Sequence, residues 1–121
     1  MDAAVDSYLP RYFAPRVYQK RPELVERIHA LMQWQDARGY AQLVRGMTER
    51  LDSHDVLDDV RVPAFVIAGA EDTISKPRLR AAADAMCAKF MVFSHGGHLP
   101  VWEAPDATAD ALLSFAQRAR G

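Results

Sequence analysis

Two short apolar runs constrain the fold of this chain more than any other feature. Residues 64–68 read Ala-Phe-Val-Ile-Ala and residues 90–93 read Phe-Met-Val-Phe, without the polar alternation of a strand that faces water. Their length and β-branched content favour strands covered on both faces, which occur in parallel sheets. A helical stripe from Lys76 to about Met86 separates the two runs. The sequence therefore predicts an α/β fold built on two parallel strands joined by a helix.

Helical patterns fill most of the remaining chain. Apolar residues recur every three or four positions over residues 22–36, which predicts an amphipathic helix that ends at Gly39. The same spacing over residues 40–51 predicts a second helix that folds back antiparallel to the first, and Asp55 is expected to cap a short helical turn. Residues 103–118 predict a last helix. We divide the chain into a helical segment, 1–59, and a strand-helix-strand-helix portion, 60–121.

The charge balance argues against several function classes. The 121 residues hold 15 Lys and Arg against 16 Asp and Glu, so the formal net charge is −1. Such a balance offers no electrostatic footprint for nucleic acid or for an anionic membrane, and we expect neither as a partner. The N-terminal sequence lacks a basic and apolar signal peptide, and no apolar run reaches the ~18 residues of a membrane span. We therefore expect a cytoplasmic protein.

The sequence predicts no cofactor and no metal. It contains neither a phosphate-binding loop nor a dinucleotide fingerprint. His95 and His98 lie close to Glu71 and Asp72, but on a glycine-rich loop and without a third clear ligand, which disfavours a metal site. Cys87 is the single cysteine, so it cannot form an internal disulfide. Its place near the end of an alanine-rich helix favours a buried thiol.

Candidate catalytic residues follow both predicted strands. Asp72 lies in the loop after the first strand, and His98 lies in the loop after the second. Loops beyond the carboxyl ends of parallel strands meet at one edge of the sheet, where α/β proteins place their working residues. A carboxylate that orients an imidazole is the acid and base pair of a nucleophilic triad.

At these positions the sequence resembles the α/β-hydrolase superfamily. The resemblance rests on Val62-Pro63 before an apolar strand, Gly69-x-x-Asp72, Pro77 opening a helix, and Gly97-His98 running into Glu103-x-Pro105. It covers residues 60–119, and the upstream helices resemble the helical lid of that family. The resemblance implies a partial α/β-hydrolase fold with Asp72 as the triad acid and His98 as the general base. It also implies a substrate pocket lined by Leu99, Trp102 and Trp34.

The sequence departs from that family at the nucleophile. The G-x-S-x-G elbow is absent, and so is the earlier oxyanion loop. Ser94 precedes a glycine by two positions, but Gly97 and Pro100 prevent the helix that should follow, so Ser94 is rejected as nucleophile. We expect a chain that is inactive alone and that needs a complementing N-terminal hydrolase polypeptide to act on an ester, lactone or similar small carbonyl substrate. The alternative is a non-catalytic module that self-associates or pairs with a partner through open strand edges.

Overall fold

The two predicted strands form a parallel pair. The computed structural model describes residues 2–120, apart from the side chain of Asp2. Strand β1 (Phe65–Gly69) pairs with β2 (Lys89–Phe93), so that Phe65 lies opposite Lys89 and Gly69 opposite Phe93. Helix α5 (Lys76–Ala85) connects them. The predicted strand, helix, strand unit is therefore confirmed.

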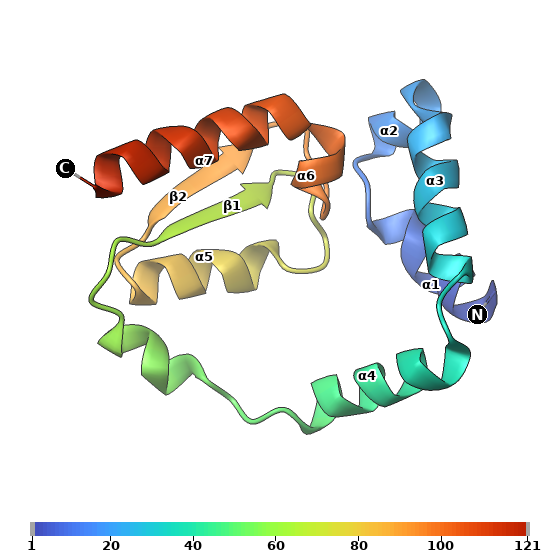
Figure 1. Ribbon diagram of the computed structural model, residues 1–121, viewed down its shortest axis with the longest axis horizontal. Coiled ribbons are helices and arrows are strands. Elements are labelled where there is room, and N and C mark those ends of the chain that lie inside the picture. Colours follow the sequence, from blue (N-terminus) through green and yellow to red (C-terminus); the bar gives the residue numbers. More distant parts are fainter. Residues whose placement is uncertain (1, 121) are drawn as a thin grey trace.

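Helices cover both faces of this small sheet. Figure 1 shows α5 on one side of the strands and α7 (Pro105–Ala119) on the other. The rings of Phe65 in β1 and Phe115 in α7 lie 5.2 Å apart between centroids. A separate turn of helix, α6 (Pro100–Glu103), precedes α7. The prediction of one helix from residue 103 was wrong in this respect, because Ala104 precedes a proline and adopts a non-helical backbone that breaks the helix there.

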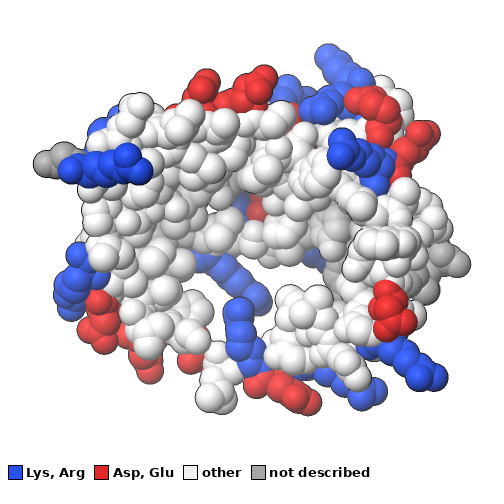
Figure 2. All heavy atoms as spheres, in the orientation of Figure 1, with Lys and Arg blue, Asp and Glu red and all other residues white. Residues whose placement is uncertain are grey.

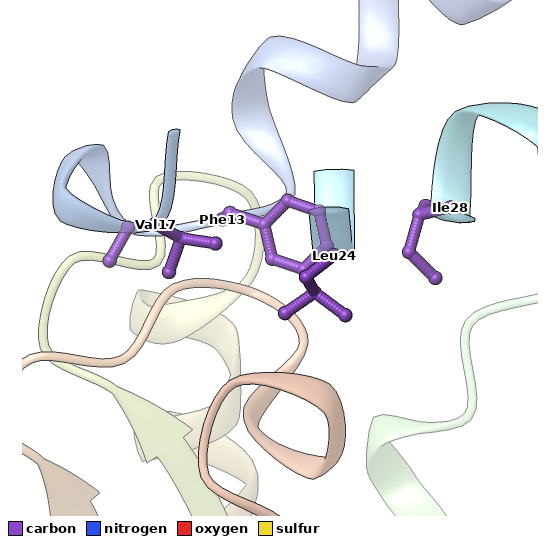
Figure 3. Packing of buried hydrophobic residues seen from close by; sticks show 5 residues of the cluster. Phe13, Val17, Leu24 and Ile28 are labelled. Atoms are coloured by element: carbon purple, nitrogen blue, oxygen red, sulfur yellow. The ribbon is translucent and has the colours of Figure 1, made fainter. Parts of the chain in front are cut away.

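The N-terminal helices contain the main cluster of buried side chains. Helix α1 (Asp2–Tyr8), the 3₁₀ turn η1 (Leu9–Arg11) and α2 (Pro15–Lys20) precede α3 (Pro22–Gln33). The first three were not predicted, because each is too short to show a helical stripe. Figure 3 shows Phe13, Val17 and Leu24 gathered between α2 and α3, with Ile28 further along. Leu99 and Trp102 pack against this cluster, so it joins the two parts of the chain.

The predicted antiparallel helix pair does not form. Helix α4 (Ala37–Glu49) begins before Gly39, because the Asp36 side chain caps it by accepting a hydrogen bond from the Gly39 amide at 2.6 Å. Figure 1 shows α4 leading away from the lower end of α3 instead of folding back along it. None of the α4 side chains is buried. The short helical turn is present as η2 (His54–Asp59), but the prediction that Asp55 caps it was wrong, because Ser53 precedes the turn and Asp55 lies within its first turn.

The prediction of a buried Cys87 was also wrong. Cys87 is exposed and is the one residue other than glycine with a positive φ, 51°, in the described chain. It follows the last residues of α5, where its amide and that of Ala88 donate to the carbonyls of Asp84 and Ala83. A residue in the left-handed region is a common way to end a helix, and this role places the thiol outside the core.

The surface is hollowed between α4 and the part of the molecule that carries the sheet (Figure 2). Acidic and basic side chains lie mixed around the outline of this face. None of the helices in the described part of the chain is long and apolar enough to cross a membrane. In the same orientation, Figure 1 shows α4 below this hollow, and α5 with the loop that leads into it above.

Close backbone contact at Gly69 leads to a stability prediction. A Cβ atom at Gly69 would lie 2.1 Å from the Gly96 carbonyl oxygen and 2.2 Å from that of Gly97, and backbone atoms cannot move aside as a side chain can. We expect Gly69→Ala to lower the free energy of unfolding by roughly 3 kcal/mol, measured by urea denaturation. Gly46→Ala is the matched control, because nothing lies within 4 Å of its added Cβ. It should stabilise α4 by about 0.5–1 kcal/mol. Equal effects of the two substitutions would contradict this account.

Candidate active site

The site is formed by the two loops that follow β1 and β2. The amides of Ala70 and Glu71 donate to the carbonyls of Phe93 and Gly96, each at 2.9 Å. These bonds extend the pairing of the strands into the loops. Together with the contact at Gly69, they fix the distance between the loop after β1, which carries Asp72 (the acid loop), and the loop after β2, which carries His98 (the histidine loop).

Asp72 is held as a buried carboxylate. Only 5% of the residue is exposed. Its Oδ1 accepts hydrogen bonds from the amides of Ile74 at 2.7 Å and Ser75 at 3.0 Å. Burial raises the pKa of the Asp72 carboxyl, but hydrogen bonds from Ser75, Ile74 and His98 outweigh it, so the pKa lies below its ordinary value of 3.8. Asp72 is therefore ionised at neutral pH.

His98 lies beside this carboxylate. Its Nδ1 is 3.3 Å from Asp72 Oδ2 and 3.2 Å from the Ser75 hydroxyl oxygen. The His98 side chain is 30% exposed, whereas that of Asp72 is 2% exposed. The structure thus brings the two predicted catalytic residues together, with the acid inside and the imidazole at the surface of a cavity.

The N-terminal segment fixes the histidine from the other side. The His98 amide donates to the Tyr12 carbonyl at 2.9 Å, and the two rings stack with centroids 5.8 Å apart. Glu103 is buried and accepts hydrogen bonds from the Gly97 amide at 2.8 Å and the Ala14 amide at 3.0 Å. The carboxylate of Glu103 therefore ties the loop that carries His98 to the segment that carries Tyr12.

A cavity of about 460 Å³ opens in front of His98. Among the described residues, no Lys, Arg, Asp or Glu lines it, and its wall is mostly apolar. Burial raises the pKa of the Tyr12 phenol above its ordinary value, and the neighbouring Tyr40 and Tyr8 raise it further, so this phenol stays neutral. The wall is formed by Tyr8, Tyr12, Tyr40, Leu43, Val44, Met47, Thr48, Ile74 and His98.

The other three predicted site residues lie outside this cavity. Trp34 is 84% exposed at the end of α3. Leu99 and Trp102 pack against the apolar cluster of α2 and α3, and the guanidinium of Arg27 covers the Trp102 ring at 5.1 Å. Neither Leu99 nor Trp102 lines the cavity in front of His98, and Trp102 instead borders a separate hollow together with Leu24 and Arg27. Their assignment to substrate binding stays a prediction without support from this geometry.

Three residues of the site were not assigned roles from the sequence. Ser75 follows Asp72 by three positions, and aspartate side chains often accept hydrogen bonds from residues two or three positions later, so the sequence contained a local indication of this contact. Glu103 was part of the motif that carried the resemblance, but its hydrogen bonds to Gly97 and Ala14 need the fold. No pattern in the sequence indicated a role for Tyr12.

The structure does not favour a metal site at these loops. Glu71 and His95 are exposed, and no group of three potential metal ligands occurs among residues 2–120.

The lowered pKa of Asp72 predicts a dependence of stability on pH. Because the folded state favours the ionised carboxylate, the stabilisation is fully present above the ordinary pKa of 3.8 and is lost as the pH falls through the lower pKa of the folded state. The difference in free energy of unfolding between the wild type and Asp72→Asn should therefore be constant near neutral pH and shrink below about pH 4. Urea denaturation across this range measures it, with Glu71→Gln as the control for an exposed neighbouring acid. A difference that does not shrink on acidification would contradict the prediction.

Two solved structures share this arrangement of elements. An esterase from Thermogutta terrifontis, in a malate-bound structure, superposes with a TM-score of 0.91 at 28% identity over 98% of this chain and 44% of its own. The enol-lactonase of Burkholderia xenovorans LB400 superposes with a TM-score of 0.87 at 26% identity over 97% of this chain and 45% of its own. No family model and no curated protein sequence matches. The chain thus spans less than half of each neighbour, and what it shares with these hydrolases is a partial α/β-hydrolase fold.

Proposed function

We propose that this chain supplies the acid and the general base of a serine hydrolase that acts on an ester, a lactone or a similar carbonyl compound. The observation that carries the proposal is the Asp72 and His98 pair, with Nδ1 of the imidazole 3.3 Å from the buried carboxylate and the ring at the cavity. The hydrolase activities of both structural neighbours support it.

The Asp72 and His98 geometry suits the proton transfers of acyl transfer. With Nδ1 turned to Asp72, Nε2 is the nitrogen that accepts the proton of a serine hydroxyl as its oxygen attacks the carbonyl carbon. The same proton then passes to the leaving alkoxide, and the C–O bond of the ester breaks to give an acyl-enzyme. Water, deprotonated by His98, hydrolyses that acyl-enzyme and restores the serine. Asp72 stays ionised throughout and stabilises the imidazolium.

Within the proposal, the nucleophilic serine comes from outside these 121 residues. The sequence contains no G-x-S-x-G elbow. Ser94 is exposed and lines a separate small pocket, and Ser75 donates its hydroxyl hydrogen to Asp72. The coverage of under half of each neighbour is consistent with a nucleophile carried elsewhere. The chain alone is therefore expected to lack turnover.

The cavity favours neutral, apolar substrates. The described residues of its wall carry phenols, apolar side chains, one threonine and the His98 imidazole, with no Lys or Arg among them to pair with a carboxylate. A charged acyl group would lose its hydration there without gaining a partner, at a cost that a neutral ester avoids. The proposed substrates are thus uncharged at the part that enters the space between Tyr12 and α4.

Complementation tests the proposal. The chain would be expressed together with, or fused to, the segment of the Thermogutta esterase that it does not match, and assayed with neutral nitrophenyl esters. We expect turnover that falls at least about 1000-fold in His98→Ala and in Asp72→Asn. His95→Ala and Glu71→Gln are the matched controls, because they remove the same groups from exposed neighbouring positions. Hydrolysis of esters by the isolated chain, dependent on His98, would refute the claim that the nucleophilic serine comes from outside these 121 residues. Turnover unaffected by His98→Ala would refute the assigned base.

A second candidate function is a non-catalytic interaction module. It is favoured by exposed apolar surface on α4, where Leu43 is 61% and Met47 67% exposed, and by strands that pair only with each other within residues 2–120. This candidate predicts self-association of the isolated chain, measured as mass in solution, that Met47→Lys weakens. A monomer that regains activity on complementation would exclude it.

A further inference from the structure

Ser75 lies between the two catalytic residues. Its hydroxyl oxygen is 2.6 Å from Asp72 Oδ2 and 3.2 Å from His98 Nδ1. The direct separation of Nδ1 and Oδ2 is 3.3 Å, so the imidazole is as close to the serine as to the acid. The three polar groups form a triangle in which each side is a hydrogen-bond distance.

The donors and acceptors in this triangle can be arranged in one way only. The Asp72 carboxylate is ionised and has no hydrogen to donate, so the short contact must be donated by the Ser75 hydroxyl. That hydrogen is then unavailable to His98, and the serine oxygen faces the ring with lone pairs alone. Both neighbours of Nδ1 are therefore acceptors, and Nδ1 must carry a hydrogen. In the neutral ring, this leaves Nε2 unprotonated.

We propose that Ser75 is a positioning residue, which locks the Asp72 carboxylate and holds His98 in the tautomer that leaves Nε2 free to act as a base. The effect of Ser75 on catalysis rests on the proposed function, whereas its effect on the His98 tautomer does not. Ser75 is not itself a nucleophile in this arrangement. Its hydrogen is bound to Asp72, and it does not line the cavity in front of His98.

Ser75 donates a hydrogen bond to each carboxylate oxygen of Asp72. Its amide donates to Oδ1 at 3.0 Å while its hydroxyl donates to Oδ2 at 2.6 Å, which prevents the carboxylate from rotating away from the ring. Ser75 also precedes the first residue of α5, so its backbone is anchored by the helix. Without the hydroxyl, Oδ2 would keep only the longer contact to His98. The imidazole would lose one of its two acceptors and part of its preference for one tautomer.

The first test needs no enzymatic activity. Nitrogen-15 NMR of the full chain, at a pH where the His98 ring is neutral, reports which ring nitrogen carries the hydrogen. We expect the wild type and Ser75→Thr, which keeps the hydroxyl, to show mainly the Nδ1–H form. Ser75→Ala should raise the Nε2–H form by about 5-fold. Ser94→Ala, an exposed serine in the histidine loop, is the matched control and should change nothing. An unchanged tautomer ratio in a folded Ser75→Ala variant overturns the proposal.

The second test uses the complemented enzyme. Ser75→Ala should lower kcat by about 10-fold with little change in KM, and Ser75→Thr should restore most of it. Complete loss of turnover, together with labelling of Ser75 by a fluorophosphonate, would overturn the positioning role by making Ser75 the nucleophile. Failure of complementation would refute the proposed function, whereas the tautomer measurement would decide the role of Ser75 independently.

Discussion

The buried carboxylate of Glu103 is the interaction on which the arrangement of the site depends. It accepts hydrogen bonds from the Gly97 amide, next to His98, and from the Ala14 amide, in a segment far away along the chain. A buried charge is tolerated only when it is fully hydrogen-bonded, and bonds between an amide and a carboxylate are among the stronger ones in proteins. The space between the two backbones is minimal, because a Cβ on Gly97 would lie 2.5 Å from the Ala14 nitrogen. Glu103 therefore fixes the N-terminal helices against the histidine loop.

This attachment turns two unlike parts of the chain into one site. The Tyr12 ring stacks on that of His98 because Glu103 holds the segment containing Ala14 in place. The Arg21 guanidinium donates a further hydrogen bond to the backbone carbonyl of Glu103 at 3.0 Å. The strands contribute the acid and the histidine, while the helices contribute most of the cavity wall. Neither part would form the cavity alone. The division at residues 59 and 60 drawn from the sequence stays a prediction, and the site spans it.

Sequence patterns predicted the parts of this structure that depend on local order. The apolar runs, the helix between them and the loops after each strand follow from periodicity and from the rule that parallel strands carry their working residues at one edge. Asp72 and His98 could be chosen on that basis. Tyr12 and the role of Glu103 could not, because they act through contacts between residues distant in sequence. The direction of α4 was not predicted, because Gly39 was interpreted as the end of the preceding helix. In the structure Gly39 lies in the first turn of α4, where its amide donates to the capping side chain of Asp36.

The described chain leaves part of the apolar surface of the sheet exposed. Strand β1 has no charged residue and ends in two buried positions, as expected of a strand with neighbours on every side, yet Phe65, Val66 and Ile67 remain partly exposed. Val92 in β2 is 44% exposed. Exposed side chains of this kind gain nothing from water, and an uncovered edge of backbone amides and carbonyls can pair with a further strand. The same holds for the apolar side of α4 across the cavity. This exposed surface is compatible with both proposed functions, since a complementing hydrolase segment and a second copy of the chain would each cover it. Only the hydrolase segment would also give the Nε2 of His98 a hydroxyl to deprotonate.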